Sequence, residues 1–234
     1  MTVVTVSVEN GTVHFSAAQK WTWVNQLAWH ADGGSIYSSD VSGSGDSDLF
    51  LTDARGGNPK RLTSDSGFNN FPSVTPDGRY IVFSRLPAKA PPSIWRMDID
   101  GANQKQLTDK FDLDPHVSPD GQWFVYESWS GKLTLWKMPV EGGQPVHLTE
   151  TRSWLGLFSP DGKLILAFQS ETDLPLRIAI LPSIGGQPVK TFTPAKGVES
   201  FDGARTGARS SMSSRVTVFP IYRRRRFKVV SLSN

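Results

Sequence analysis

The sequence predicts an all-β fold: a β-propeller of four-stranded antiparallel blades, with four full blades and partial blades at the ends, forming an incomplete ring. Three observations predict it. One turn motif recurs at a near-constant interval, a hairpin motif follows it with a similar period, and no segment shows the 3.6-residue apolar periodicity of a helix. A β-sandwich has turns at similar spacing but gives no reason for the same motifs to recur.

The first motif is a tight turn between two strands. In Ser/Thr-Pro-Asp-Gly, proline presets φ, aspartate bonds the backbone beyond it, and glycine accepts the left-handed conformation that follows. The turn aspartates are spaced by 45, 43 and 41 residues. The residues assigned to these structural turns are Asp32, Gly33, Pro76, Asp77, Gly78, Pro119, Asp120, Gly121, Pro160, Asp161 and Gly162.

The second motif is an Asp-Gly or Gly-Gly hairpin followed by a short strand that ends in threonine. These closing residues, spaced by 45, 41 and 44, are Thr63, Thr108, Thr149 and Thr193. Near-continuous apolar strands such as 80–83 and 123–126 follow the first motif, as expected where neighbouring sheets cover both faces. Four strands in a repeat of about 40–45 residues are typical of a propeller blade.

We expect the propeller to occupy residues 1–198. The predicted blades span about 25–64, 68–109, 112–150 and 153–193. Residues 2–17 read as two strands around an Asn-Gly turn, so the chain is expected to begin within a blade. A ring that stays open leaves edge strands exposed, which favours pairing or aggregation.

Residues 199–234 depart from the repeat and form an irregular basic tail. They carry eight Arg and Lys residues against two acidic ones, whereas residues 1–198 have a net charge of −3. The next turn is due in this region, and the codons of Asp202–Met212, shifted by two bases, permit Trp-Ser-Pro-Asp-Gly. We therefore expect a frameshift near residues 199–202. The run Arg223–Arg226 is then better explained as a product of that shift than as a nuclear-localisation or phosphate-binding patch.

Composition and motif searches predict no catalytic, cofactor-binding or metal-binding residue. Cysteine is absent, which excludes disulfides and thiolate metal sites. The chain has no nucleophile elbow, Walker loop or paired-carboxylate motif, and no nucleic-acid partner is expected. The histidines are too dispersed to suggest a ligand cluster: His14, His30, His116 and His147.

Three further features have alternative interpretations. The aspartates of the segment 40–48 offer oxygen ligands, but their spacing fits a polar loop better than a calcium site: Asp40, Asp46 and Asp48. Asn10-Gly11-Thr12 is a glycosylation sequon that reads more simply as a hairpin turn. No apolar run reaches the ~20 residues of a membrane span, and the first residues lack the pattern of a secretory signal.

The tryptophans divide into two groups. Trp95, Trp123 and Trp136 lie within predicted strands and are assigned to the core. The others lie near strand starts or in loops, where core packing is favoured but aromatic side chains can also anchor partners at a funnel or rim: Trp21, Trp23, Trp29, Trp129 and Trp154.

The turns, together with IWRMDIDGANQKQLT and LWKMPVEGGQPVHLT, resemble PD40 repeats, the WD40-like blades of TolB, of some prolyl-oligopeptidase and tricorn-like peptidases, and of large bacterial regulators and kinases. The resemblance covers about residues 20–198. It implies a non-catalytic binding or scaffolding module for protein–protein interaction or sensing, with an unknown protein or peptide partner, within a larger bacterial protein. The alternative is the substrate-gating propeller of a serine peptidase. The resemblance implies a periplasmic or extracytoplasmic parent, or otherwise a cytoplasmic one.

We predict that sequencing the gene across codons 195–210 will reveal a shifted frame that encodes Trp-Ser-Pro-Asp-Gly and further blades. The physical reason is that the repeat places the next turn about 44 residues after Asp161. An intact reading frame that reproduces the present tail would contradict the frameshift.

Overall fold

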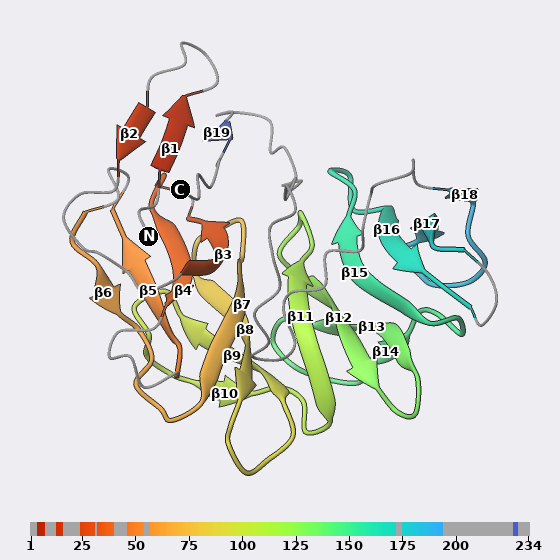
Figure 1. Cartoon of the computed structure of the whole chain (residues 1–234), viewed down its shortest axis with the longest axis horizontal. Coiled ribbons are helices and arrows are strands. Elements are labelled where there is room, and N and C mark those ends of the chain that lie inside the picture. Colours follow the sequence, from red (N-terminus) through yellow and green to blue (C-terminus); the bar gives the residue numbers. More distant parts are fainter. Residues whose placement is uncertain are drawn as a thin grey trace.

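The computed structural model describes residues 4–7, 13–15, 24–30, 32–39, 46–53, 57–171, 175–193 and 227–228. These residues form four four-stranded antiparallel sheets and one three-stranded sheet, and within them no segment is helical. The four larger sheets follow one another as blades of an arc that is not a closed ring (Figure 1). The predicted fold class is confirmed.

Each blade is an antiparallel meander of four consecutive strands, ordered β3-β4-β5-β6, β7-β8-β9-β10, β11-β12-β13-β14 and β15-β16-β17-β18. The strands of the first two blades are β3 (Val24–Trp29), β4 (Ser35–Ser39), β5 (Asp48–Thr52), β6 (Lys60–Arg61), β7 (Phe68–Val74), β8 (Tyr80–Leu86), β9 (Ser93–Asp98) and β10 (Lys105–Gln106). Those of the last two are β11 (Phe111–Val117), β12 (Trp123–Trp129), β13 (Leu133–Pro139), β14 (Val146–His147), β15 (Ser153–Phe158), β16 (Leu164–Gln169), β17 (Arg177–Pro182) and β18 (Lys190–Phe192).

The three-stranded sheet joins the two ends of the described chain. Its strand order is β19-β1-β2, with β1 at Val4–Ser7, β2 at Val13–Phe15 and β19 at Phe227–Lys228. Both pairings are antiparallel. The other residues of the tail, including the predicted frameshift, lie outside the described residues, as does the sequon at 10–12.

The first strand of every blade contains a bulge. The pairing register shifts there, and a residue other than glycine adopts positive φ: Gln26 (37°), Phe71 (55°), Asp114 (54°) and Leu155 (54°). Such a residue is strained by about 1–3 kcal/mol, and bulges bend the strand that carries them. These first strands contact one another between adjacent blades and lie toward the middle of the arc, whereas the fourth strands lie at its periphery (Figure 1).

The turn after each first strand is closed by a hydroxyl and a carboxylate. The hydroxyls of Thr75, Ser118 and Ser159 donate to the aspartate two residues later, at 2.6, 2.5 and 2.6 Å. That aspartate also accepts the backbone N–H two residues further on, at 3.0–3.1 Å. The first blade has His30 in place of the hydroxyl residue, and its Nδ1 lies 2.6 Å from Oδ1 of Asp32.

Apolar side chains fill the seams between blades. Between the second and third blades, the fully buried Val82 and Ile94 pack against Phe124, Tyr126 and Met138. The seams on either side are built in the same way, with Leu49 and Phe83 in one cluster and Leu135 and Ile165 in the next. Each large side chain buried in this way contributes about 1.5–3 kcal/mol, so the seams are the main source of stability.

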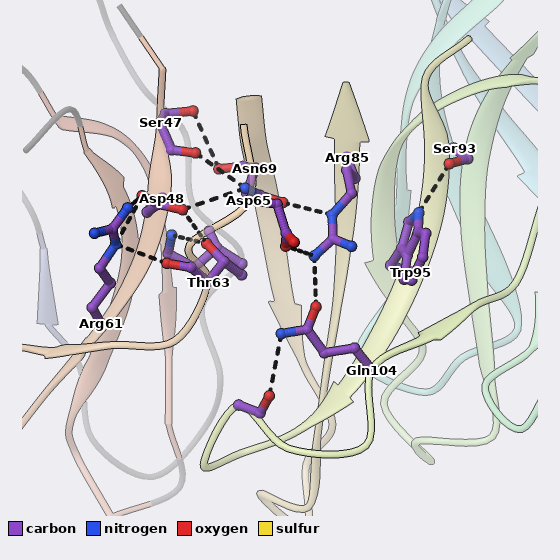
Figure 2. Close-up of polar contacts among 12 residues, drawn as sticks. Ser47, Asp48, Arg61, Thr63, Asp65, Asn69, Arg85, Ser93, Trp95 and Gln104 are labelled. Carbon is purple, nitrogen blue, oxygen red and sulfur yellow. Dashed lines mark hydrogen bonds and ion pairs between the residues drawn. The ribbon is translucent and has the colours of Figure 1, made fainter. Parts of the chain in front are cut away.

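Polar groups close the ends of the seams. Thr63, Thr108 and Thr149 each accept the backbone N–H at the start of the third strand of their own blade, at 2.9–3.0 Å. In the first seam the Thr63 hydroxyl also donates to Oδ1 of Asp48 at 2.7 Å, and the Arg61 guanidinium binds the second carboxylate oxygen of Asp48 (Figure 2).

The same network crosses into the second blade. The side-chain N–H of Asn69 donates to the Ser47 carbonyl at 3.3 Å. The side-chain oxygen of Asn69 accepts the Nε–H of Arg85 at 3.0 Å. Arg85 also pairs with Asp65 at 2.7 Å and lies over the Trp95 ring, 4.2 Å from its centroid (Figure 2). Figure 2 shows these contacts as a chain that runs from Asp48 in the first blade through Asn69 to Arg85 and Gln104 in the second. The half-buried Arg85 guanidinium is therefore supplied with acceptors from its own blade, Asn69 and Gln104, and from Asp65 in the connection between the two blades.

Asp112 occupies in the third blade the position of Asn69 in the second, two residues before the bulge. Only 2% of the residue is exposed, and its Oδ1 has no hydrogen-bond partner within the residues described. Burial raises the pKa of this carboxyl, while hydrogen bonds from Ser128 and Thr108 partly oppose the shift. The backbone N–H of Asp112 bonds the Pro92 carbonyl at 3.1 Å, as that of Asn69 bonds Ser47 at 2.9 Å.

Ser118→Ala should lower the free energy of unfolding by about 1–2 kcal/mol at neutral pH, because its buried hydroxyl bonds Asp120 and both the N–H and the C=O of Trp123. The hydroxyl also holds the pKa of Asp120 below its ordinary value, so its contribution is lost as pH falls through that lowered pKa. The variant should therefore show a smaller loss of stability in acid, measured by urea unfolding between neutral and acid pH. Ser118→Thr is the control, and equal acid sensitivity of Ser118→Ala and the wild type would contradict the assignment.

Asp112→Asn should raise the free energy of unfolding at neutral pH by about 1 kcal/mol or more, because it removes a buried carboxylate with an unpartnered oxygen. An amide can donate to the Pro92 carbonyl as Asn69 does to Ser47. A raised folded pKa means that wild-type stability falls as pH rises from the ordinary aspartate pKa to the raised one. The difference in unfolding free energy between Asp112→Asn and the wild type, measured by urea unfolding, should therefore vanish at pH values below the ordinary aspartate pKa. A constant advantage at every pH would contradict this explanation.

Candidate functional site

A pocket of about 740 Å³ opens between the third and fourth blades, at the end of the sheets opposite the Pro-Asp-Gly turns. It lies where second strands end and the loops to the third strands begin. Its lining combines one large aromatic side chain with charged and polar groups from both blades: Trp129, Lys132, Glu150, Arg152, Ser170 and Glu171. This volume falls in the range of ordinary ligand pockets.

A tight loop presents Trp129 and Lys132 together. Trp129 ends β12 and pairs with Leu133, so only three residues connect the two strands. Gly131, with φ of 85°, makes this short connection possible without backbone strain. The Trp129 residue is 46% exposed, although the five preceding residues of β12 are buried. The fold therefore holds a large aromatic side chain at the surface.

The fourth blade contributes Arg152, which is held by two contacts. Its Nη1 donates to the Ser170 hydroxyl at 3.2 Å, and its guanidinium lies over the Trp154 ring, 4.9 Å from the centroid. Ser170 in turn donates its backbone N–H to the Arg152 carbonyl at 3.1 Å. These contacts fix the guanidinium at the mouth of the pocket.

The two carboxylates of the pocket differ in their surroundings: Glu171 has a cationic partner, whereas the Glu150 side chain is 92% exposed. Glu171 lies 3.3 Å from Arg177, and Glu150 lies 3.3 Å from Nδ1 of His147. Lys132, in contrast, donates to the backbone carbonyl of Glu150. In the part of the chain that the structure describes, neither Lys132 nor Arg152 forms an ion pair with a carboxylate.

The residues assigned from the sequence to structural turns lie at the other end of the sheets. There, the turn of one blade contacts the turn of the next blade. His30 Nε2 donates to the Gly78 carbonyl at 3.3 Å. A Cβ added at Gly121 would lie 3.1 Å from Pro76, and one at Gly162 would lie 3.8 Å from Pro119. The aspartates bond within their own turns, where hydroxyl and backbone donors lower the pKa of Asp77, Asp120 and Asp161.

The inner strands place several titratable groups near one another. Asp114 donates its backbone N–H to the Ser84 hydroxyl at 3.0 Å, and its carboxylate lies 3.5 Å from Nε2 of His116. In the next blade, the Leu155 N–H bonds Glu127 at 2.9 Å. The second strand of one blade thus supports the bulge of the next. Over the described ranges, no group of three or more histidine and acidic side chains is placed to hold a metal ion.

The other aromatic and acidic candidates are placed as follows. Trp95 and Trp136 are half-buried, and their indole N–H groups donate to Ser93 and Thr134, both at 3.0 Å. Trp154 stacks on Phe168 with centroids 6.1 Å apart. Trp29 and Trp123 are half-buried. Asp46, also half-buried, directly precedes Ser47 and Asp48 in the chain. Trp21, Trp23 and Asp40 lie outside the described residues, and Asp48 accepts from Thr63 and Arg61 in the seam network.

Lys132 and Arg152 were not predicted as site residues. Each stands in a loop sequence that differs from those of the other repeats, so no motif singles it out. The available signal was indirect. Lys132 lies three residues after Trp129 and Arg152 lies two residues before Trp154, and the sequence places both tryptophans near strand starts or in loops.

Comparisons with known proteins agree on the fold. A protein from Agrobacterium fabrum named "Uncharacterized protein Atu1656" is 27% identical over an alignment of 176 residues, and the match covers 68% of this chain and 58% of that protein. TolB from Acinetobacter baumannii superposes with a TM-score of 0.67 at 20% identity, over 82% of this chain and 52% of TolB. A structure of prolyl endopeptidases gives a TM-score of 0.58 at 12% identity, over 80% of this chain and 30% of that chain.

The chain thus spans little more than half the length of the first two relatives. No helix among the described residues is long and apolar enough to cross a membrane. The PD40 family model, described as the TolB beta propeller domain, matches residues 7–184. The chain therefore belongs to the PD40 family of TolB-type β-propellers.

Proposed function

We propose that this chain is a non-catalytic β-propeller module that binds a protein or peptide partner, and that the pocket around Trp129 is the binding site. The observation that carries the proposal is an exposed tryptophan at a pocket of about 740 Å³ on the loop end of the blades. Exposed aromatic side chains in pockets dominate the energetics of many protein interfaces. Propeller loops also vary in sequence on a rigid scaffold, which suits them to recognition.

The geometry of the site supports a rigid surface. Trp129 is held by a three-residue loop, and Arg152 is held by Ser170 and Trp154. A partner would therefore meet side chains that lose little conformational freedom on binding. The family membership supports an extracytoplasmic location as part of the same proposal. The alternative function, a gating propeller for a serine peptidase, has support from fold likeness alone.

Peptides selected from a random display library against the intact chain should bind Trp129→Ala at least about 30-fold more weakly than the wild type, the loss typical of a central interface residue. The measurement is a titration by isothermal calorimetry or fluorescence anisotropy. Since Trp129 is 46% exposed, its removal should leave the unfolding temperature nearly unchanged.

Phe68→Ala is the matched control. Phe68 is 42% exposed and starts the first strand of the second blade, at the same end of the sheets but in another seam. Peptides should bind this variant like the wild type. Equal binding to Trp129→Ala and the wild type would show that the pocket is not the binding site.

A further inference from the structure

We infer that the pocket between the third and fourth blades recognises an acidic peptide segment, with side-chain carboxylates on Lys132 and Arg152 and an apolar side chain on Trp129. This inference rests on the proposed function and names the chemistry of its ligand. It commits to aspartate or glutamate side chains of a peptide rather than to a free chain terminus.

The charges of the pocket carry the inference. The lining holds two acidic and two basic side chains, so its formal charge is balanced. Of the two carboxylates, Glu171 lies 3.3 Å from Arg177, whereas the Glu150 side chain is 92% exposed and lies 3.3 Å from Nδ1 of His147. Within the described residues, Lys132 and Arg152 have only neutral acceptors, a backbone carbonyl and a hydroxyl. The pocket therefore presents two cations that have no carboxylate partner among the described residues.

The chemistry of Arg152 suits a carboxylate. A guanidinium is planar and presents parallel N–H donors that match the two oxygens of a carboxylate. The Ser170 hydroxyl accepts from Nη1 only, and the Trp154 ring covers one face of the group. These two contacts restrict the orientation of the exposed guanidinium, which reduces the entropy lost on binding.

The aromatic wall and the volume favour a peptide over a small anion. An inorganic anion would use the cations but leave Trp129 without a contact, whereas about 740 Å³ accommodates several side chains. Trp129 lies only three residues from Lys132, so an apolar side chain next to an acidic one could contact both. Acidic residues flanking an apolar one are thus the pattern that the lining selects.

The test uses the intact chain and three acetylated, amidated octapeptides. Each contains one phenylalanine, three glycines and four copies of glutamate, glutamine or lysine. Binding is read from the indole N–H resonance of Trp129 in proton–nitrogen NMR spectra, assigned by its loss in Trp129→Phe. The blocked ends remove any contribution from a terminal carboxylate.

The glutamate peptide should shift the Trp129 resonance in a saturable manner and bind on the order of tenfold more tightly than the glutamine peptide. The lysine peptide should bind more weakly still. Lys132→Gln and Arg152→Gln should each weaken binding of the glutamate peptide by about three- to tenfold, and added salt should reduce the difference between peptides. Lys163→Gln is the control, because it removes the same charge from a turn at the opposite end of the sheets.

Two results would overturn the inference, and they bear differently on the proposed function. Equal shifts of Trp129 by the glutamate and glutamine peptides would exclude acidic recognition while supporting a peptide site at this pocket. If no peptide shifts Trp129, acidic recognition is again overturned. The proposed function is tested separately by the library-selected peptides. It is overturned too if those peptides bind Trp129→Ala as tightly as the wild type.

Discussion

A four-stranded blade has two apolar faces and can bury both only against neighbouring blades, and this constraint governs the rest of the structure. Val82 and Ile94 are fully buried because the third blade covers them, and Val125 and Leu135 are buried by the fourth. Since each seam repeats the same positions, stability grows by one interface with each added blade.

The apolar residues at the outer strands of the blades differ in exposure. The outer strand of the fourth blade ends in Phe192, which is 41% exposed. Leu62 and Leu148, which follow the outer strands of the first and third blades, are 6% and 4% exposed, and Leu107 in the second blade is of intermediate exposure. In the first and third blades, the hairpin glycine of the next blade, Gly101 or Gly185, lies against the leucine.

The parts of the fold that depend on local chemistry could be predicted from the sequence. Ser-Pro-Asp-Gly specifies its own turn, since its hydroxyl, carboxylate and glycine act within five residues. The period of Thr63, Thr108 and Thr149 follows from the backbone N–H near the start of the third strand that each of these three hydroxyls accepts. These interactions need the same residue types in every blade, and they therefore leave a repeat in the sequence.

The parts that depend on contacts between blades could not be predicted in the same way. His30 replaces a hydroxyl residue because its ring reaches both Asp32 and the carbonyl of Gly78 in the next blade. Asp112 and Asn69 share a position but have different partners. The pocket likewise needs two loops that are distant in the sequence, and Trp129 was only one of several tryptophans that could have reached the surface.

The bulge in each first strand has a consequence for how this propeller can change over evolution. Its backbone geometry is shared by glutamine, phenylalanine, aspartate and leucine, so the geometry is imposed by the sheets and does not depend on which side chain stands there. Selection on folding therefore leaves this position comparatively free. Four inner strands with one such position each could diversify the chemistry presented toward the middle of the arc while every strand keeps its place, much as hypervariable positions diversify a binding surface on a constant framework.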